Sequence, residues 1–209
     1  MYSWTNRRWA EMRSSAPIHQ PLEPLEVDAL CDMLNSANLS GGMYFRCEFT
    51  APWGMQIPQG PMAEFHIVVR GQCWLRVPGA KSPVPLRAGD IAVFMSGGPH
   101  ALVDSPKGKA LPPDVVLKGQ NLEHFGPVTF GGDGPPATVL CGYFKFDRES
   151  RNPMIDALPP LIHICGTDGK SDLESVVALM MEESRAARPG AEVVVNRLCE
   201  VLFVRIVRD

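Results

Sequence analysis

Two residues that could do chemistry, Glu64 and His66, stand two positions apart in an otherwise apolar stretch. The apolar Phe65 and Ile67 alternate with them, which is the period of a β-strand and places the carboxyl and imidazole groups on one face. A buried carboxyl group is costly unless it is hydrogen-bonded. We therefore expect Glu64 and His66 either to form a satisfied pair that fills the interior or to contact a polar ligand.

A zinc site is a further hypothesis for the same region. His66, Cys73, His100 and Cys141 all fall on or next to predicted strands, and the strand period turns Cys73 toward the same face as Leu75. Two imidazoles and two thiolates suit tetrahedral zinc. Their spacing matches no local zinc motif, so the sequence predicts these ligands only by residue type.

The remaining reactive residue types have simpler interpretations. Trp53 either stacks on a bound molecule or fills the core. Three cysteines lie in apolar stripes and are expected to be core thiols: Cys31, Cys165 and Cys199. Three histidines show no pattern of partners: His19, His124 and His163. The chain has no G-x-S-x-G sequence and no glycine-rich phosphate loop, so neither an α/β-hydrolase site nor a nucleotide site is supported.

The elements that position these residues are predicted to be short strands. Apolar residues alternate with polar ones in several segments between residues 43 and 146, and Pro/Gly turns separate the segments. The stretch 104–136 is rich in Gly, Pro and Lys and is expected to be a long loop with one or two strands. Strands without intervening helices are typical of an antiparallel sandwich or a small barrel.

Helical periodicity flanks this region. A short amphipathic helix is predicted over 27–39, and two further helices follow Pro159-Pro160, the second over 191–207. That last segment is apolar at 12 of 17 positions, more than one barrel face can cover. It is expected either to be buried within its own chain or to meet a second copy or a further domain. The predicted organisation is a tail at 1–22, a barrel at 23–160 with a short N-terminal helix, and a helical hairpin at 161–209.

Composition narrows the class of protein. The 209 residues carry a net charge of −3, so the chain lacks the basic surface that nucleic acid requires. No segment is long and apolar enough for a membrane span, and the N-terminus has no secretory pattern. The six scattered cysteines are expected to be reduced thiols, and the protein is expected to be cytoplasmic.

Two segments resemble the cupin motifs. Residues 89–100, GDIAVFMSGGPH, fit G-D-x4-P-x-G-x2-H except that Met95 replaces Pro, and residues 64–71, EFHIVVRG, are similar to the end of the first motif. The wider run resembles the sensor half of AraC-type transcriptional regulators. The supporting pieces are YFR at 44–46, APWG at 51–54, FHIVVRGQCWL at 65–75, LRAGD at 86–90, LCGYFKF at 140–146, ALPP at 157–160 and RPGAE at 188–192.

This resemblance, which covers about residues 23–209, implies a mostly β fold with helices: a double-stranded β-helix (cupin or jelly-roll barrel) followed by an antiparallel helical hairpin. It implies that the barrel binds a small effector, here through Glu64, His66, His100 and Trp53, and that the hairpin forms a homodimer. It also implies that DNA is bound only by a helix-turn-helix domain that this chain lacks. The effector itself is not indicated.

The alternative is a metal-dependent cupin enzyme, such as a dioxygenase or isomerase, with Glu64 and His100 as ligands and His66 as a displaced one. Cupin enzymes place two histidines as HxH before the glutamate. Here Pro58 and Gly60, or Ile57 and Gln59, hold those positions. Two remaining ligands do not make a catalytic iron or manganese site, so the chain is predicted not to be an enzyme.

Overall fold

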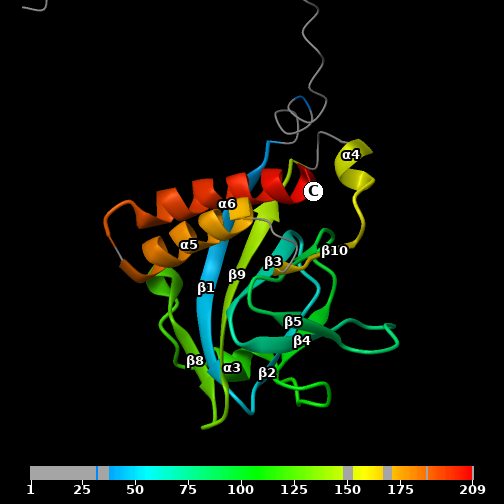
Figure 1. Cartoon of the computed structure of the whole chain (residues 1–209), viewed down its shortest axis with the longest axis vertical. Helices are drawn as coiled ribbons and strands as arrows, with labels where there is room; N and C mark the ends of the chain where they lie inside the picture. Colours follow the sequence, from blue (N-terminus) through cyan, green and yellow to red (C-terminus); the bar gives the residue numbers. More distant parts are fainter. Residues whose placement is uncertain (1–31, 33–37, 148–152, 167–170, 187, 209) are drawn as a thin grey trace, which may run out of the picture.

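The computed structural model describes residues 32, 38–147, 153–166, 171–186 and 188–208. The predicted tail at 1–22 lies outside these residues, and the helix predicted over 27–39 lies almost wholly outside them. Within the described part of the chain, β-strands dominate and two long helices follow at the C-terminal end (Figure 1). The expectation of a mostly β protein with some helices is confirmed.

Six strands form the larger sheet, in the order β10-β6-β3-β9-β1-β8. Their bounds are β1 (Ser40–Thr50), β3 (Ala63–Arg70), β6 (Ile91–Phe94), β8 (Val128–Gly131), β9 (Pro136–Lys145) and β10 (Leu161–Ile164). All neighbours are antiparallel except β1 and β8, which are parallel. The long strands β1, β3 and β9 occupy the middle of this sheet and hold most of the buried residues.

Four strands form the smaller sheet, in the order β2-β7-β4-β5. Their bounds are β2 (Gly54–Ile57), β4 (Gln72–Arg76), β5 (Val84–Arg87) and β7 (His100–Val103). One apolar core contains residues of both sheets, for example Val68 and Val139 from the larger sheet and Leu75 and Leu102 from the smaller one. The two sheets therefore pack face to face around a shared interior, as expected for the cupin fold.

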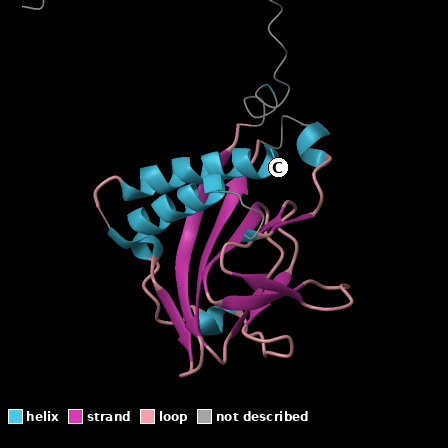
Figure 2. Cartoon of the chain, viewed as in Figure 1, coloured by secondary structure: helices cyan, strands magenta, loops and turns pink. Residues whose placement is uncertain are grey.

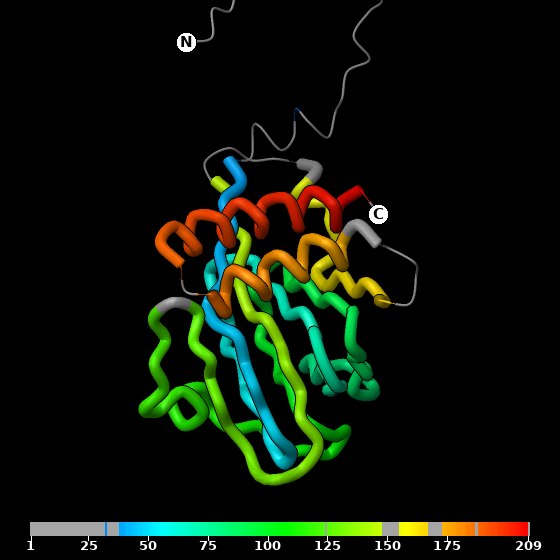
Figure 3. The backbone as a smooth tube through the Cα atoms, turned by 60° about the vertical axis from the view of Figure 1, so that its left-hand side comes forward, coloured from blue at the N-terminus to red at the C-terminus, as the bar shows by residue number. Residues whose placement is uncertain are grey.

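The outer face of the larger sheet is covered by helices. α5 (Ser171–Ala186) and α6 (Ala191–Arg208) lie side by side, and α6 crosses β1 (Figures 1 and 3). The layers are clear in Figure 2, where both helices lie on one side of the strands. The remaining short elements are α3 (Pro113–Val116), the 3-10 turn η1 (Glu123–Phe125) and α4 (Pro153–Asp156).

A second apolar core joins the helices to this outer face. Phe203 of α6 packs on Phe144 of β9 and on Phe146, with ring centroids 5.0 and 5.1 Å apart. Met180 of α5 and Phe65 of β3 are buried in the same core. Alternate residues of β3 thus face opposite cores, because successive side chains of a strand point to opposite faces.

A buried arginine connects β1 to α5. Arg46 is 6% exposed, and its Nη1 donates to the backbone oxygen of Ser184 at 3.1 Å and to the Ser184 Oγ at 3.3 Å. Its Nε pairs with Glu48 at 2.9 Å. Because hydrogen bonds from a charged donor are stronger than neutral ones, Arg46 is expected to hold α5 against the sheet.

We expect Arg46→Ala to lower the free energy of unfolding by about 2–4 kcal/mol, from the lost charged hydrogen bonds and the lost packing of the side-chain stem. Urea denaturation followed by circular dichroism measures this. Glu48→Gln is the control: its side chain is 42% exposed, so losing that ion pair should cost less than about 1 kcal/mol. Equal losses in the two variants would show that the contacts to α5 contribute nothing.

Strand β10 differs from the sequence-based expectation, and the packing of α6 bears on an expectation that was left open. Strand β10 pairs with β6, so residues 161–164 belong to the sheet although they fall within the range predicted for the hairpin. The segment 191–207 was expected either to be buried within its own chain or to meet a second copy or a further domain, and Leu202 of α6 is fully buried within its own chain. The apolar residues of α6 that remain exposed are Val193, Val194 and Val201.

No helix among the described residues is long and apolar enough to cross a membrane.

Candidate ligand-binding site

Three strands bring the predicted site residues together in the interior between the sheets. His66 of β3 is directly paired with Cys141 of β9 in the antiparallel register. His100 begins β7 in the opposite sheet. Glu64 and His66 share one face of β3, as the strand period predicted, and this face points into the interior, as the cupin resemblance implied, while Phe65 between them faces the helices. Glu64, His66, His100 and Cys141 are all buried.

The two histidines belong to a chain of hydrogen bonds. His66 Nε2 lies 2.7 Å from His100 Nε2, and His66 Nδ1 lies 3.2 Å from Cys141 Sγ. Cys141 Sγ lies 3.9 Å from Cys47 Sγ on β1. At the other end, His100 Nδ1 lies 2.7 Å from the carbonyl oxygen of Gly98. The chain therefore runs from Cys47 through Cys141, His66 and His100 to the backbone.

The positions of the protons follow from the end of this chain. A carbonyl oxygen only accepts, so His100 Nδ1 carries a hydrogen. Burial and the neighbouring His66 lower the pKa of His100 to about 3, so its ring is neutral and its Nε2 accepts. His66 Nε2 must then donate to His100. The ring face of His100 stacks on Phe94 with centroids 3.7 Å apart, which fixes its orientation.

The two thiols differ in acidity. Hydrogen bonding from Cys47 and the adjacent His66 lower the pKa of Cys141 to about 5, against the effect of burial. Burial raises the pKa of Cys47 well above its usual value, so Cys47 stays a thiol and donates. Burial also raises the pKa of Cys73 to about 12. Cys141 is therefore placed to accept from Cys47, whereas Cys73 stays a thiol in the apolar core.

Glu64 is the one incompletely satisfied member of the cluster. It is 9% exposed, and its Oε2 is buried without a hydrogen-bond partner among the described residues. Burial raises the pKa of this carboxyl group, although the nearby His66 opposes the shift. An unsatisfied buried acceptor costs about 1–3 kcal/mol. A carboxyl group held at this cost next to two histidines is available to bind a donor group of a ligand.

The histidine pair as it stands does not fit a metal centre. One donor atom from each of Glu64, His66 and His100 falls within 4.8 Å of the others. Two nitrogens on one tetrahedral zinc ion, however, are about 3.3 Å apart, and the two Nε2 atoms are at 2.7 Å, the distance of a direct hydrogen bond. Positions 57–60, where cupin enzymes carry HxH, hold no histidine.

The zinc set predicted from residue types does not converge either. His66 turns its Nδ1 toward Cys141 and its Nε2 toward His100. No single nitrogen of His66 therefore faces both of the other proposed ligands, as a shared zinc ion would require. Among the described residues, neither Cys73 nor Cys141 belongs to a group of three metal-binding side chains within ligand distance. Cys73 does face the interior, as predicted, and packs in its apolar core.

Trp53 belongs to the apolar core between the sheets and not to the chain of hydrogen bonds. Trp53 is buried and packs on Phe49 with ring centroids 4.7 Å apart, so it fills the core and leaves no open face for a ligand. A cavity of about 450 Å³ adjoins His100 and is also lined by Gln56 and Arg76. Of the histidine pair, His100 is the member that lines this cavity.

A second cluster was not predicted from sequence. Asp90, His163 and Cys165 bring one potential ligand atom each to within 4.8 Å of one another. Cys165, expected to be a core thiol, is only half-buried, and His163, for which no partner was expected, faces Asp90. The H-x-C spacing of His163 in β10 and Cys165, which directly follows β10, fits two side chains on one side of the chain and was the signal in the sequence.

Comparison with known proteins decides the family. A protein-family model described as cupin matches residues 28–209, which is most of the chain. The chain belongs to the cupin family. The cupin chain is 22% identical over 188 residues to a protein of Streptomyces antibioticus described as an AraC-like transcription regulator, covering 90% of this chain and 59% of that protein.

A second relative of this cupin chain is the HTH-type transcriptional regulator AlkR of Acinetobacter baylyi, at 20% identity over 187 residues, covering 88% of this chain and 61% of AlkR. The chain thus spans about three fifths of the length of both regulators. The predicted resemblance to the cupin-type domain of AraC-family regulators is confirmed.

Solved structures are more distant from this cupin chain. The match to ToxT K231A of Vibrio cholerae covers 81% of this chain and 56% of the ToxT chain, with a TM-score of 0.41 and 8% identity. The match to YhaK of Escherichia coli covers 60% of this chain and 42% of the YhaK chain, with a TM-score of 0.35 and 11% identity. Both scores are too low for the likeness to bear on function.

Proposed function

We propose that the chain is the effector-sensing and dimerisation part of an AraC-type transcriptional regulator and acts in the cytoplasm. The single observation that carries the sensing role is Glu64, whose Oε2 is buried beside the histidine pair without a partner among the described residues. The two relatives that are transcription regulators support the regulatory role.

The effector we propose is a small molecule with a hydroxyl or amine group. That group would donate to Glu64 Oε2, and the rest of the molecule would occupy the space beside His100, where Gln56 and Arg76 supply further polar contacts. Trp53 packs on Phe49 inside the core, so we keep only Glu64, His66 and His100 as proposed contacts.

The proposed mechanism is a shift between two arrangements of the helices. His66 faces the interior, whereas its neighbours Phe65 and Ile67 pack in the core beneath α5 and α6. A ligand that contacts the inward face of β3 and shifts this strand therefore also shifts Phe65 and Ile67, on which the helices pack. An effector that binds one arrangement more tightly increases its population, and in the whole regulator this would change the placement of the DNA-binding domains.

Ligand screening tests the sensing role. The 209-residue chain would be heated with individual hydroxylated or aminated small molecules, and a true ligand at about 100 times its Kd should add about 2.7 kcal/mol to the free energy of unfolding. We expect Glu64→Ala to lose this effect and the control Glu48→Gln, on the surface of the same sheet, to keep it. A ligand that stabilises wild type and Glu64→Ala equally would contradict the proposed site.

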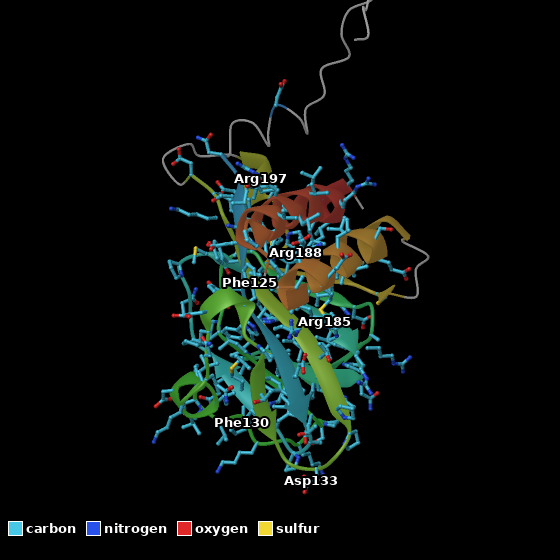
Figure 4. All side chains as sticks on the ribbon, turned by 90° about the vertical axis from the view of Figure 1, so that its left-hand side faces the viewer. Phe125, Phe130, Asp133, Arg185, Arg188 and Arg197 are labelled. Carbon is cyan, nitrogen blue, oxygen red and sulfur yellow. The ribbon has the colours of Figure 1, made fainter. Side chains whose placement is uncertain are left out.

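Dimerisation is proposed through the exposed side of the helix pair. Val193, Val194 and Val201 of α6 and Leu179 of α5 remain exposed. Arg188 and Arg197 lie on the same helical side of the molecule, whereas Asp133 lies at the opposite end (Figure 4). Burial of these apolar side chains against a second copy would remove them from water.

A metal-dependent cupin enzyme was the alternative. The direct hydrogen bond between His66 and His100 and the absence of HxH at 57–60 speak against it. The named relatives of the chain are regulators. We therefore propose no catalytic step at this site.

A further inference from the structure

We propose that Asp90, His163 and Cys165 form a binding site for a divalent metal ion of the zinc type, separate from the interior between the sheets. The three residues offer oxygen, nitrogen and sulfur, the three ligand atoms found at protein zinc sites. All three lie at the edge of the larger sheet, where β10 pairs with β6.

The distance between ligand atoms fits a metal better than it fits a hydrogen bond. His163 Nε2 lies 3.4 Å from Asp90 Oδ2, which is long for a hydrogen bond. Oxygen and nitrogen ligands of one tetrahedral zinc ion are separated by about 3.3–3.4 Å. Cys165 brings its Sγ into the same group, within 4.8 Å of the other two ligand atoms. This spacing contrasts with the 2.7 Å between the two interior histidines.

The backbone brings the three residues together. His163 and Cys165 alternate along β10 and its end, so their side chains leave the chain on one face. Gly89 and Gly166 touch each other: a Cβ added at Gly89 would lie 2.9 Å from the Gly166 Cα. Gly89 also has a φ of +94°, which favours glycine. Only two residues without side chains allow the turn before β6 to approach the end of β10 this closely.

The carboxylate of Asp90 is held in place before any metal binds. Its Oδ1 accepts from the Gly166 N–H at 2.8 Å, and its Oδ2 accepts from the Arg87 N–H at 3.0 Å. A carboxylate has about four acceptor positions, so a lone pair remains on the side of His163. Hydrogen bonds of this kind orient metal ligands in proteins and strengthen binding.

The site is accessible and has room for a fourth ligand. The side chain of Asp90 is 9% exposed and that of His163 is 26% exposed. Cys165, Gly89 and Gly166 also line a cavity of about 860 Å³ between the sheet and α5. A water molecule or a ligand in this cavity could complete a tetrahedron. A bound ion would tie β10 to the turn before β6, directly beside α5.

Cobalt binding tests this site. The untagged chain would be stripped with a chelator, kept reduced, and titrated with Co²⁺, whose bond to a thiolate gives a charge-transfer absorption band in the near ultraviolet. We expect one equivalent of Co²⁺ to produce the band and Zn²⁺ to abolish it by displacement. We expect Cys165→Ser to lose the band and His163→Gln to weaken Co²⁺ binding by more than about 100-fold, beyond the loss caused by removing a residue that only orients a ligand.

Matched variants separate this site from the interior cluster. Cys141→Ser and His100→Gln change the interior cluster, and Cys199→Ser removes a buried thiol of α6; all three should keep the band. Circular dichroism checks that each variant is folded. A wild-type chain without the band, or a band that persists in Cys165→Ser and disappears in Cys141→Ser, would overturn the proposal.

Discussion

Replacing Leu202 with aspartate is expected to unfold the domain. Leu202 is 0% exposed and packs in the core between α6 and the larger sheet. Removing a buried leucine costs about 2–5 kcal/mol, and burying an unpaired carboxylate adds several more. The sum approaches the whole stability of a typical domain, about 5–15 kcal/mol. Far-ultraviolet circular dichroism and thermal denaturation measure the loss.

The neighbouring residue supplies the matched variant. Val201 is 44% exposed, so Val201→Asp should leave the circular dichroism spectrum unchanged. If the exposed side of α6 forms the dimer interface, sedimentation should show a dimer for the wild-type chain and a monomer for Val201→Asp. A dimer that survives Val201→Asp would place the interface elsewhere, and a folded Leu202→Asp would contradict the packing of α6.

Replacing Glu64 with leucine is expected to stabilise the protein in the absence of ligand. The substitution removes a buried carboxyl group whose Oε2 has no partner among the described residues. Relief of that desolvation should raise the free energy of unfolding by about 1–3 kcal/mol. The same variant should lose effector binding, which is the trade between stability and function expected at a binding site. A destabilised Glu64→Leu would show that the carboxyl group is already satisfied in the free protein.

The pH dependence of this gain follows from the raised pKa of Glu64. The folded state holds the proton more tightly than the unfolded state, so ionisation of Glu64 destabilises the wild type as pH rises from the unfolded pKa through the folded pKa. The advantage of Glu64→Leu should therefore be largest above the folded pKa and smaller below the unfolded one. Urea denaturation of both proteins across this range measures it. An advantage that grows toward low pH would contradict the raised pKa.

Strand alternation predicted that Glu64 and His66 share one face of β3, because side chains of a strand have a strict period of two, and the cupin resemblance implied that this face points inward. The same rule predicted that Cys73 faces the interior. It could not predict that His66 pairs with Cys141, since that contact depends on the register between β3 and β9, which are 75 residues apart at this point. The distance between His66 and His100, which decides against a metal, depends on how the two sheets pack.

The short strands were harder to predict. β10 has only four residues and follows two prolines, so its apolar pattern fits the start of a helix as well as a strand. Pairing with β6 decides the outcome, and this pairing is what brings His163 and Cys165 to Asp90. Helical periodicity predicted α6, but it could not distinguish Leu202, buried in its own core, from Val201, left exposed on the other side.

The coding sequence downstream of the codon for Asp209 tests the central claim most directly. If the chain is the sensing part of an AraC-type regulator, the reading frame should continue for about 100 residues that form a basic stretch with two helix-turn-helix patterns. The match to this chain covers only 59% and 61% of the lengths of the two regulator relatives. A stop codon immediately after Asp209 would contradict the regulator and leave a cupin domain with a different role.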